Sequence, residues 1–297
     1  MTTPLDRKIR AAIARRSCVI SPQTNACRLF NAARDGLDGV TIDDFAGRWL
    51  LSTKELDAPA LPGDLGYRSL YIKFLSKGTK TAPRHAAGEK LLARFPVQEN
   101  GVSYWIDFQA GYSQGLFLDQ RLNRSRLREL SPGCNVLNTF AYTCGFGVVA
   151  ALAGGNTVNL DLSRAYLDWG RDNYRLNQLD PEQHDFIYGD VFDWLGRFAK
   201  RKLRFDFIVL DPPTFSRNRK SGVFRAEDDY SELLELALRV LRQQGIILCC
   251  LNAHHISATQ FKNILKQRLP PHVDLRQEPM PEDFPGSNYL KTFWVFL

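Results

Sequence analysis

The sequence lacks the cysteine and histidine patterns of metal proteins and of disulfide-bonded secreted domains. Its 297 residues include six cysteines without a C-x-x-C pair, and the five histidines show no metal-like spacing with them. We therefore expect reduced thiols, no bound metal and a cytoplasmic location. No apolar run is long enough to cross a bilayer, and the charged stretch 5–16 does not fit a signal peptide, so no membrane association is expected.

Also missing is the G-x-G-x-x-G fingerprint of dinucleotide-binding folds. Residues 134–163 nevertheless follow the order strand, glycine-containing turn, helix, strand and acidic residue, with Gly145 and Gly147 in the turn. We expect these glycines to let the backbone approach a ligand, and the helix N-terminus to offer N–H groups. An ordinary βαβ unit without a ligand remains the alternative interpretation.

The side chains around this turn favour a nucleoside cofactor. Asp161 ends the second strand, where a carboxylate can accept hydrogen bonds from two ribose hydroxyls. Ser163 is placed to cap the next helix. A loose loop carrying Phe140 and Tyr142 suits S-adenosylmethionine better than a pyrophosphate.

The chain carries a formal net charge of +7, which favours a polyanionic partner. Basic residues gather in three segments, 121–128, 197–204 and 217–225. Each segment alone is typical of a solvated face, but three in one chain favour a nucleic acid.

Composition and periodicity predict three parts. Residues 1–20 form a basic amphipathic helix, which either docks on the body or lies along RNA. Residues 21–95 form a small β-rich domain for RNA binding or linkage, with a hairpin around Ala46 and Gly47. Residues 96–297 alternate strands and helices, which predicts an α/β fold with a doubly wound, Rossmann-like, mostly parallel sheet.

In the third part, strands are expected near 102–108, 115–118, 135–140, 157–161, 184–188, 205–211, 245–251, 272–276 and 291–297. Helices are expected near 119–130, 144–153, 163–177, 190–200, 228–243 and 257–268. Ligands of doubly wound sheets bind beyond the carboxyl ends of the strands, so polar residues at those ends are the site candidates.

The ends of the strands expected near 184–188 and 205–211 carry further candidate site residues. Asp190 can cap the next helix and can also bind an adenine amino group, with the Val191 N–H bonding a ring nitrogen. After the strand expected near 205–211 comes Asp211-Pro212-Pro213-Thr214-Phe215, whose prolines fix the backbone. Asp211 and Pro212 would then flank the methyl group, and Phe215 could stack on a base; a rigid turn is the alternative.

The strand expected near 245–251 leads into Asn252, which is followed by His254 and His255. The histidines have no carboxylate partner nearby in the sequence, so we interpret them as structural. Asn252 is the position that discriminates between possible methylation chemistries.

These motifs in combination resemble the bacterial class I S-adenosylmethionine-dependent 23S rRNA methyltransferases, a family that includes 5-methylcytosine enzymes and the guanine-N7 half of a bifunctional enzyme. The resemblance covers nearly the whole chain and is carried by residues 34–43, 115–121, 136–143, 211–215 and 290–294. It implies S-adenosylmethionine as cofactor and ribosomal RNA, as 23S rRNA or a pre-50S particle, as partner.

The resemblance also implies roles for individual residues. By this resemblance, residues 115–121 line the cofactor pocket and the turn 138–147 holds methionine and ribose. Asp161 binds ribose, Asp190 binds the adenine end, and Asp211 flanks the methyl-transfer site. The implied cofactor contacts are Phe117, Gln120, Arg121, Asn138, Phe140, Tyr142, Thr143, Gly145, Asp161, Ser163, Asp190, Val191 and Asp211.

Two departures from the family pattern matter. The N-terminal PUA module is not expected, because only a short basic helix precedes residue 25. The cysteine that 5-methylcytosine chemistry needs is replaced by Asn252, although Cys250 could point the same way. Guanine N7 needs no covalent step, so nitrogen methylation is favoured over C5.

Two other function classes remain open from the sequence: a non-catalytic RNA-binding module, and a small-molecule or protein methyltransferase. The sequence leaves the target nucleotide and the oligomeric state undetermined.

Overall fold

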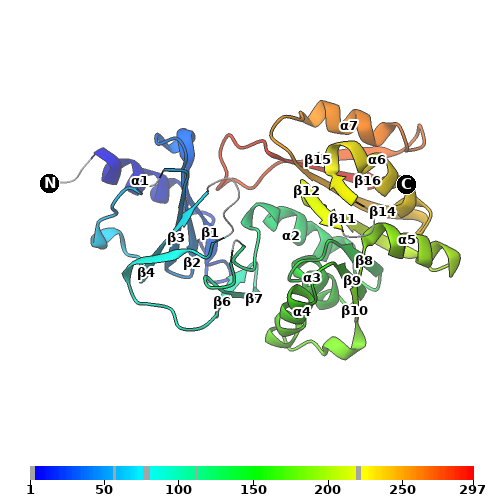
Figure 1. The fold of residues 1–297 in the computed structure, drawn as a ribbon, viewed down its shortest axis with the longest axis horizontal. Coiled ribbons are helices and arrows are strands. Elements are labelled where there is room, and N and C mark those ends of the chain that lie inside the picture. Colours follow the sequence, from blue (N-terminus) through cyan, green and yellow to red (C-terminus); the bar gives the residue numbers. More distant parts are fainter. Residues whose placement is uncertain (1–3, 56–57, 76–80, 112, 219–221) are drawn as a thin grey trace. The chain divides into compact units, whose positions relative to one another are not determined.

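The computed structural model describes residues 4–55, 58–75, 81–111, 113–218 and 222–297, without the side chains of residues 215–228. The chain forms two compact units (Figure 1). Unit 1 comprises residues 1–121 and 281–286, and unit 2 comprises residues 122–280 and 287–297.

Unit 1 is built on a sheet whose described strands run in the order β1 (Ala26–Asn31), β2 (Val40–Phe45), β3 (Arg48–Thr53), β4 (Ser69–Phe74) and β5 (Arg84–Gly88). The expected hairpin is confirmed: β2 and β3 pair antiparallel, and Ala46 and Gly47 form the turn at positive φ. Short 3-10 helices lie at Ala32–Asp35 and Gly63–Leu65.

Helix α1 (Pro4–Arg15) packs on this sheet. Ile9 and Ala12 on its apolar face are 1% and 0% exposed, in a cluster with Leu29, Phe30 and Ile42. Of the two interpretations of the N-terminal helix, docking on the body is therefore the one the structure supports.

The hairpin of β6 (Phe95–Glu99) and β7 (Val102–Ile106) also belongs to unit 1. Phe108, which follows it, lies edge-on against Phe45, Tyr71 and Phe95, with ring centroids 5.0–5.7 Å apart. Because this aromatic cluster joins residues on both sides of position 95, the structural boundary falls at Arg121 and not near residue 95.

Unit 2 contains, in its described residues, a seven-stranded sheet of order β10-β9-β8-β11-β14-β16-β15. The strands are β8 (Asn135–Thr139), β9 (Asn156–Asp161), β10 (Asp185–Tyr188), β11 (Phe205–Leu210), β14 (Leu241–Asn252), β15 (Asp274–Glu278) and β16 (Leu290–Phe296). The first five in this order pair parallel, and β16 pairs antiparallel with both neighbours. The expected mostly parallel, Rossmann-like sheet is confirmed.

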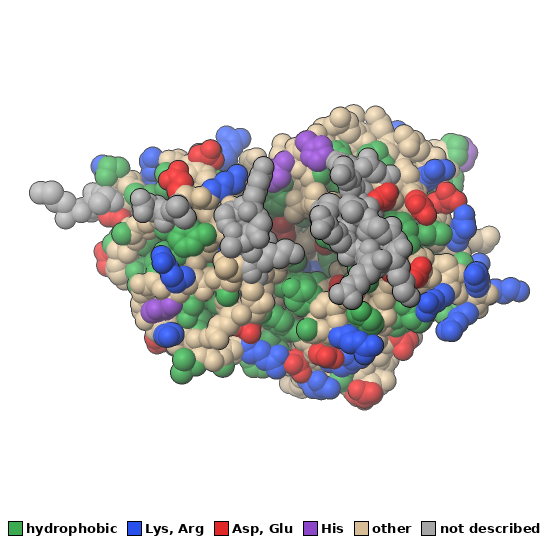
Figure 2. Space-filling model, in the orientation of Figure 1, with side chains coloured by type: hydrophobic (Ala, Val, Ile, Leu, Met, Phe, Trp, Pro, Cys, Tyr) green, Lys and Arg blue, Asp and Glu red, His purple; other side chains and the backbone are tan. Residues whose placement is uncertain are grey.

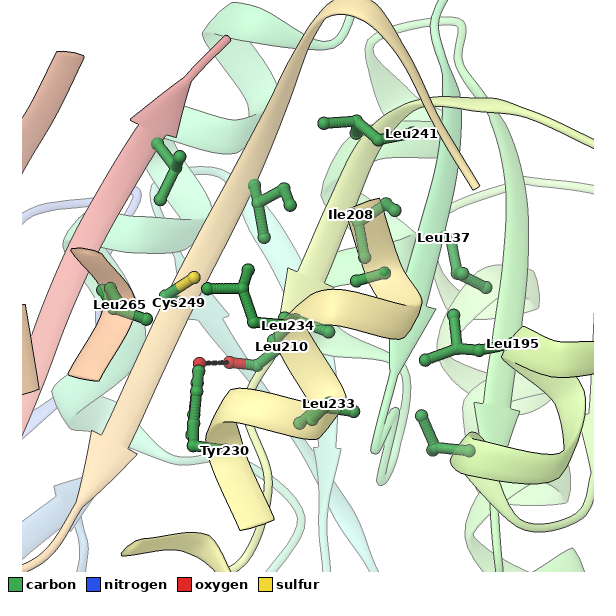
Figure 3. Packing of buried hydrophobic residues seen from close by; sticks show 14 of the residues in the cluster. Leu137, Leu195, Ile208, Leu210, Tyr230, Leu233, Leu234, Leu241, Cys249 and Leu265 are labelled. Atoms are coloured by element: carbon green, nitrogen blue, oxygen red, sulfur yellow. Dashed lines mark hydrogen bonds between the residues drawn. The ribbon is translucent and has the colours of Figure 1, made fainter. Parts of the chain in front are cut away.

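Helices cover both faces of the sheet. Helices α5 (Val191–Lys200), α6 (Ala226–Leu238) and α7 (Ala258–Lys266) pack on one face, where Leu137, Leu195, Leu210, Leu234 and Cys249 share a dry core (Figure 3). Tyr230 Oη donates to the Leu210 carbonyl within this core. Helices α2 (Arg121–Leu130), α3 (Gly145–Leu152) and α4 (Arg164–Leu176) lie on the other face (Figure 1).

Most expected elements of unit 2 are confirmed to within a few residues. The strand expected at 115–118 is wrong: residues 113–117 lie in loop conformation and are followed by a 3-10 helix, Leu118–Gln120. The short hairpin of β12 (Phe215–Asn218) and β13 (Gly222–Arg225) was not expected. A further 3-10 helix spans Pro181–Gln183. None of the described helices has the length and apolar character needed to span a membrane.

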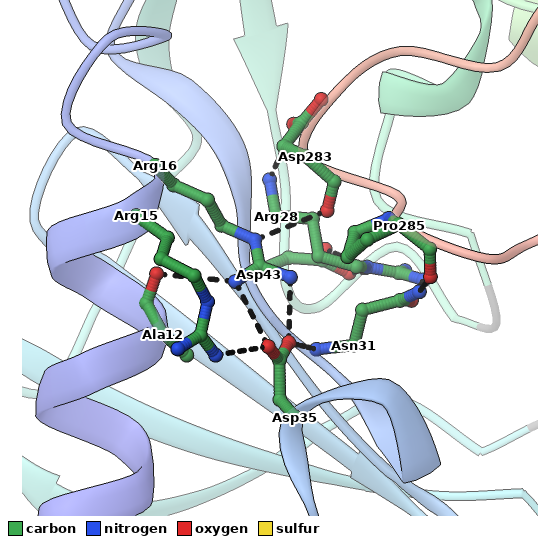
Figure 4. A network of polar contacts seen from close by, with 9 residues as sticks. All are labelled: Ala12, Arg15, Arg16, Arg28, Asn31, Asp35, Asp43, Asp283 and Pro285. Atoms are coloured by element: carbon green, nitrogen blue, oxygen red, sulfur yellow. Dashed lines mark hydrogen bonds and ion pairs between the residues drawn. The ribbon is translucent and has the colours of Figure 1, made fainter.

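Residues 281–286, which connect β15 to β16, contribute a buried carboxylate to unit 1 (Figure 4). Asp283 is 0% exposed; it accepts from Arg121 Nη1 at 3.0 Å and from the Arg28 backbone N–H at 2.9 Å. Its carbonyl accepts from Arg16 Nε at 3.2 Å, and Arg16 also pairs with buried Asp35. A segment from the far end of the chain thus completes the polar interior of unit 1.

Candidate cofactor and acceptor site

The loop between β8 and α3 has an unusual backbone. Phe140, Tyr142 and Cys144 have φ values of 52°, 49° and 60°, so alternate residues adopt the left-handed conformation without being glycine. Each such residue costs on the order of 1 kcal/mol or more, and clusters of them occur at ligand-binding loops. This is the sheet edge at which the sequence predicted the cofactor.

Gly147 of the glycine motif has a role in packing. Gly145 and Gly147 lie in the first turn of α3, and neither is among the residues at positive φ. A Cβ on Gly147 would lie 2.1 Å from Asn159 Oδ1 and 2.6 Å from Tyr174 Oη. Gly147 therefore lets α3 pack closely on β9 and α4, and the approach of this backbone to a ligand stays a prediction.

Asp161 ends β9, as expected, and its carboxylate faces the β8–α3 loop. Its Oδ2 accepts from Tyr142 N and its Oδ1 from Ser163 N, both at 2.8 Å. Burial raises the pKa of Asp161, and the backbone N–H donors of Tyr142, Ser163 and Leu162 oppose that rise. A carboxylate can accept about four hydrogen bonds, so these oxygens retain capacity for a ligand hydroxyl beyond the three backbone donors.

Two helix caps expected from the sequence are confirmed. Ser163 Oγ accepts from Tyr166 N at 3.3 Å at the start of α4. Asp190 Oδ1 accepts from the N–H groups of Phe192 at 3.0 Å and Asp193 at 3.2 Å at the start of α5. Val191, the first residue of α5, is buried. The two caps fix the direction in which the chain continues from β9 into α4 and from β10 into α5.

Other predicted cofactor residues are buried inside unit 2. Asn138 is 1% exposed and its side chain donates to Asn159 Oδ1 at 2.9 Å. The Thr143 side chain is also buried, and its carbonyl accepts from Asn173 Nδ2 at 2.9 Å. The first bond joins β8 to β9, and the second holds the β8–α3 loop to α4.

Three predicted cofactor residues belong to unit 1. Phe117 is 49% exposed, whereas Gln120 and Arg121 are buried. The guanidinium of Arg121 pairs with both carboxylate oxygens of Asp283. This ion pair gives Arg121 a structural role in unit 1.

The acceptor residues lie at the ends of β11 and β14. Asp211 is partly buried, Pro212 is buried and Asn252 is exposed. Thr214 Oγ1 donates to the carbonyl of Asn252, which joins the two strand ends. The side chain of Phe215 lies outside the described part of the chain.

All six cysteines are described, and none has an exposed thiol at the carboxyl edge of the sheet. Cys250 is 0% exposed and lies 3.9 Å from Thr292 Oγ1. Burial raises the pKa of Cys249 to about 12 and that of Cys144 well above its usual range. Cys134 precedes β8 at the opposite edge of the sheet, and Cys18 follows α1.

Sequence reasoning missed some residues that shape this edge. The ring of Tyr166 lies edge-on to Tyr142, with centroids 4.5 Å apart. Beneath the loop, Asn159 Nδ2 donates to Tyr174 Oη at 3.0 Å, and Thr157 Oγ1 lies 2.6 Å from the same hydroxyl. The polar residues Thr157 and Asn159 in a buried strand were the available signal for this network.

Comparison with known proteins identifies the class. Residues 56–289 match a family described as S-adenosylmethionine-dependent methyltransferase, and the chain belongs to this family. S-adenosylmethionine is therefore its cofactor and supplies a sulfonium-bound methyl group. The residues fit a nucleoside: the Asp161 carboxylate has acceptor capacity beside a left-handed loop at the carboxyl edge.

Among its relatives, the chain is 35% identical to Bacillus subtilis (strain 168) YwbD, provisionally named a ribosomal RNA large subunit methyltransferase, over 97% of this chain and 78% of YwbD. It is 31% identical to ribosomal RNA large subunit methyltransferase I of Yersinia pseudotuberculosis serotype O:1b, over 91% and 74%. The crystal structure of SMU.776, provisionally described as a methyltransferase and complexed with SAH, aligns with TM-score 0.85 at 29% identity, covering 98% of this chain and 80% of SMU.776.

Proposed function

We propose that this enzyme methylates a ring nitrogen, guanine N7, in large-subunit ribosomal RNA. The relatives named as large-subunit rRNA methyltransferases support the RNA substrate. On the face drawn in Figure 2, Lys and Arg side chains are interspersed with Asp and Glu on each unit. This mixed surface does not by itself select a nucleic acid, so the proposed rRNA substrate, free or in a pre-50S particle, rests on the named relatives.

In this proposal the cofactor contacts follow the carboxyl edge of unit 2. Asp161 accepts the ribose hydroxyls through its remaining lone pairs, and the Phe140–Gly145 loop with Asn138 positions ribose and methionine. Asp190 and the Val191 N–H receive the adenine, beside Ser163.

The observation that carries the choice of nitrogen is the burial of the thiols. C5 of cytosine is a poor nucleophile, so its methylation requires a thiolate to attack C6 first. Cys249 and Cys250, which precede Asn252 in β14, are both 0% exposed. No described thiol is therefore placed to form that adduct.

Guanine N7 needs neither a thiolate nor a base. Its lone pair attacks the methyl carbon, the S–CH3 bond breaks with its electrons going to sulfur, and S-adenosylhomocysteine leaves. The purine keeps the positive charge and no proton is removed at this step. Asp211, Pro212 and Asn252 then position the base in line with the methyl group, and Phe215 stacks on it.

The test is methylation of rRNA from a strain deleted for the gene, with isotopically labelled S-adenosylmethionine and mass spectrometry of the nucleosides. We expect labelled 7-methylguanosine, and we expect Cys250→Ala to retain at least half of the wild-type rate. RNA containing 5-fluorocytosine should form no covalent adduct. Labelled 5-methylcytidine, or an adduct lost in Cys250→Ala, would contradict the proposal and restore the C5 alternative.

A further inference from the structure

A pocket of about 480 Å³ opens at the carboxyl edge of unit 2, away from Asp161. It lies between the end of β14, the start of α7, the end of β15 and the start of β16. Its lining includes His254, Ser257, Glu278, Asn288 and Lys291, all of them in unit 2. None of these residues was assigned to the cofactor.

Lys291 gives this pocket a buried positive charge. It is 5% exposed, and its ammonium donates to the carbonyls of Ala253 and, at 3.3 Å, Tyr289. Across the described residues, no carboxylate forms an ion pair with it. Carbonyl dipoles compensate a buried cation incompletely, and desolvation accordingly lowers the pKa of Lys291.

The other charges of the pocket do not cancel Lys291. Glu278 accepts from Arg126 Nη1 at 2.7 Å, so its negative charge is already compensated. The N-terminus of α7 is also closed: Ser257 Oγ accepts from Gln260 N, and the Gln260 side chain accepts from Ser257 N. The pocket therefore has one uncompensated cation, which an anion would stabilise.

The position of the pocket points to the acceptor and not to the cofactor. Lys291 pairs in register with Leu251, and Leu290 pairs with Asn252, the proposed base contact. Strand β8 precedes the predicted cofactor loop. In the sheet, β11 and β14 lie between β8 and β16. Three strand spacings of about 4.8 Å separate the two regions by roughly 14 Å. In RNA, every base has a phosphodiester within one nucleotide of it.

We propose that this pocket binds a phosphodiester of the RNA next to the methylated base, with Lys291 as its charged contact. The inference rests on the proposed rRNA substrate and deepens it. It makes Lys291 a positioning residue that acts through the RNA backbone and touches no reacting atom. The rings of His254 and Tyr289, 5.5 Å apart and inclined by 33°, border the same strand ends.

The test compares Lys291→Met with Lys266→Met, which removes an exposed lysine from α7. Affinity for an rRNA fragment is measured by filter binding between 50 and 200 mM salt, and affinity for S-adenosylhomocysteine by calorimetry. We expect Lys291→Met to bind RNA about tenfold more weakly, with a salt slope smaller by about 0.7–0.9. The S-adenosylhomocysteine affinity should stay within twofold, and Lys266→Met should change neither quantity.

Loss of S-adenosylhomocysteine binding with unchanged RNA affinity would assign Lys291 to the cofactor and overturn the inference. Unchanged binding of both would show that the pocket is not a site. If Lys291→Met does not fold, Asn288→Trp decides, because it fills the pocket from an exposed position; we expect the same loss of RNA affinity. Wild-type enzyme that methylates no RNA would instead refute the proposed function, while the binding comparison would still judge this site.

Discussion

At the scale of single residues, Asp161 shows how local sequence and buried environment combine. Its place after an apolar strand and before the Ser163 cap predicted a carboxylate at the sheet edge. The structure adds that two backbone N–H groups hold this carboxylate at 2.8 Å. Its orientation is thus set before any ligand arrives, which lowers the entropic cost of binding.

Asp161→Asn should weaken S-adenosylhomocysteine binding by roughly 10- to 100-fold, because an amide replaces the charged acceptor of two hydroxyl donors. Calorimetry measures this loss. Asp168→Asn, which alters an exposed pair with Arg171 on α4, is the matched control and should bind normally. Equal affinity of both variants would exclude Asp161 from the cofactor site.

The same residue predicts a pH dependence. Burial raises the pKa of Asp161, so on acidification it takes up a proton at a higher pH than an ordinary aspartate. Cofactor affinity should therefore fall as the pH is lowered through that raised pKa, and this fall should be absent in Asp161→Asn. Titration calorimetry at several pH values measures it; parallel profiles for the two proteins would contradict the assignment.

Some conformations of single residues can be predicted from the sequence, and others cannot. Caps such as Ser163 and Asp190 are predictable because the donor and acceptor lie within three residues of each other. The left-handed conformations of Phe140, Tyr142 and Cys144 are not, because no residue type there demands positive φ. Packing of the loop against α4 and β9 imposes them.

At the scale of elements, helix α3 depends on the fit of its first turn against the sheet. Gly147 allows that approach: an added Cβ would lie within 2.1 Å of Asn159 Oδ1, in the buried network that includes Tyr174. Periodicity predicted the helix and its apolar character correctly. The reason for its glycine could not be predicted, because it lies in side chains 12 and 27 positions away along the chain.

Gly147→Ala should destabilise the protein by about 2 kcal/mol or more, because overpacking forces the network apart. Gly196→Ala in α5 meets nothing within 4 Å and should stabilise by about 0.5–1 kcal/mol. Urea denaturation of the two variants measures both changes. The same sign for both would show that helix propensity, and not packing, governs position 147.

At the scale of the whole chain, alternating strands and helices were sufficient to predict the parallel sheet of unit 2. The division between the units was not predictable, because it depends on contacts remote in sequence. Phe108 joins an aromatic cluster that includes Phe45, and Asp283 joins Arg121 across 162 positions. Local patterns contain no information about such pairs.

Asp283→Ala should destabilise unit 1 by about 3–5 kcal/mol, because it leaves Arg121 buried without its counter-ion. Glu282→Ala, at the exposed neighbouring position, is the control and should change stability by less than about 0.5 kcal/mol. Denaturant unfolding followed by tryptophan fluorescence, with Trp49 and Trp105 in unit 1, measures the difference. Equal stability of the two variants would show that the ion pair does not hold the segment in place.

The position of Asp283 late in the chain delays the folding of unit 1 during translation. After Arg121 has been added to the chain, 162 further residues must be translated before its partner exists. At about 5–20 residues per second, this takes roughly 10 to 30 s. During that interval the nascent N-terminal half holds Arg16 and Arg121 without Asp283, so its final consolidation must wait for the other half to be made.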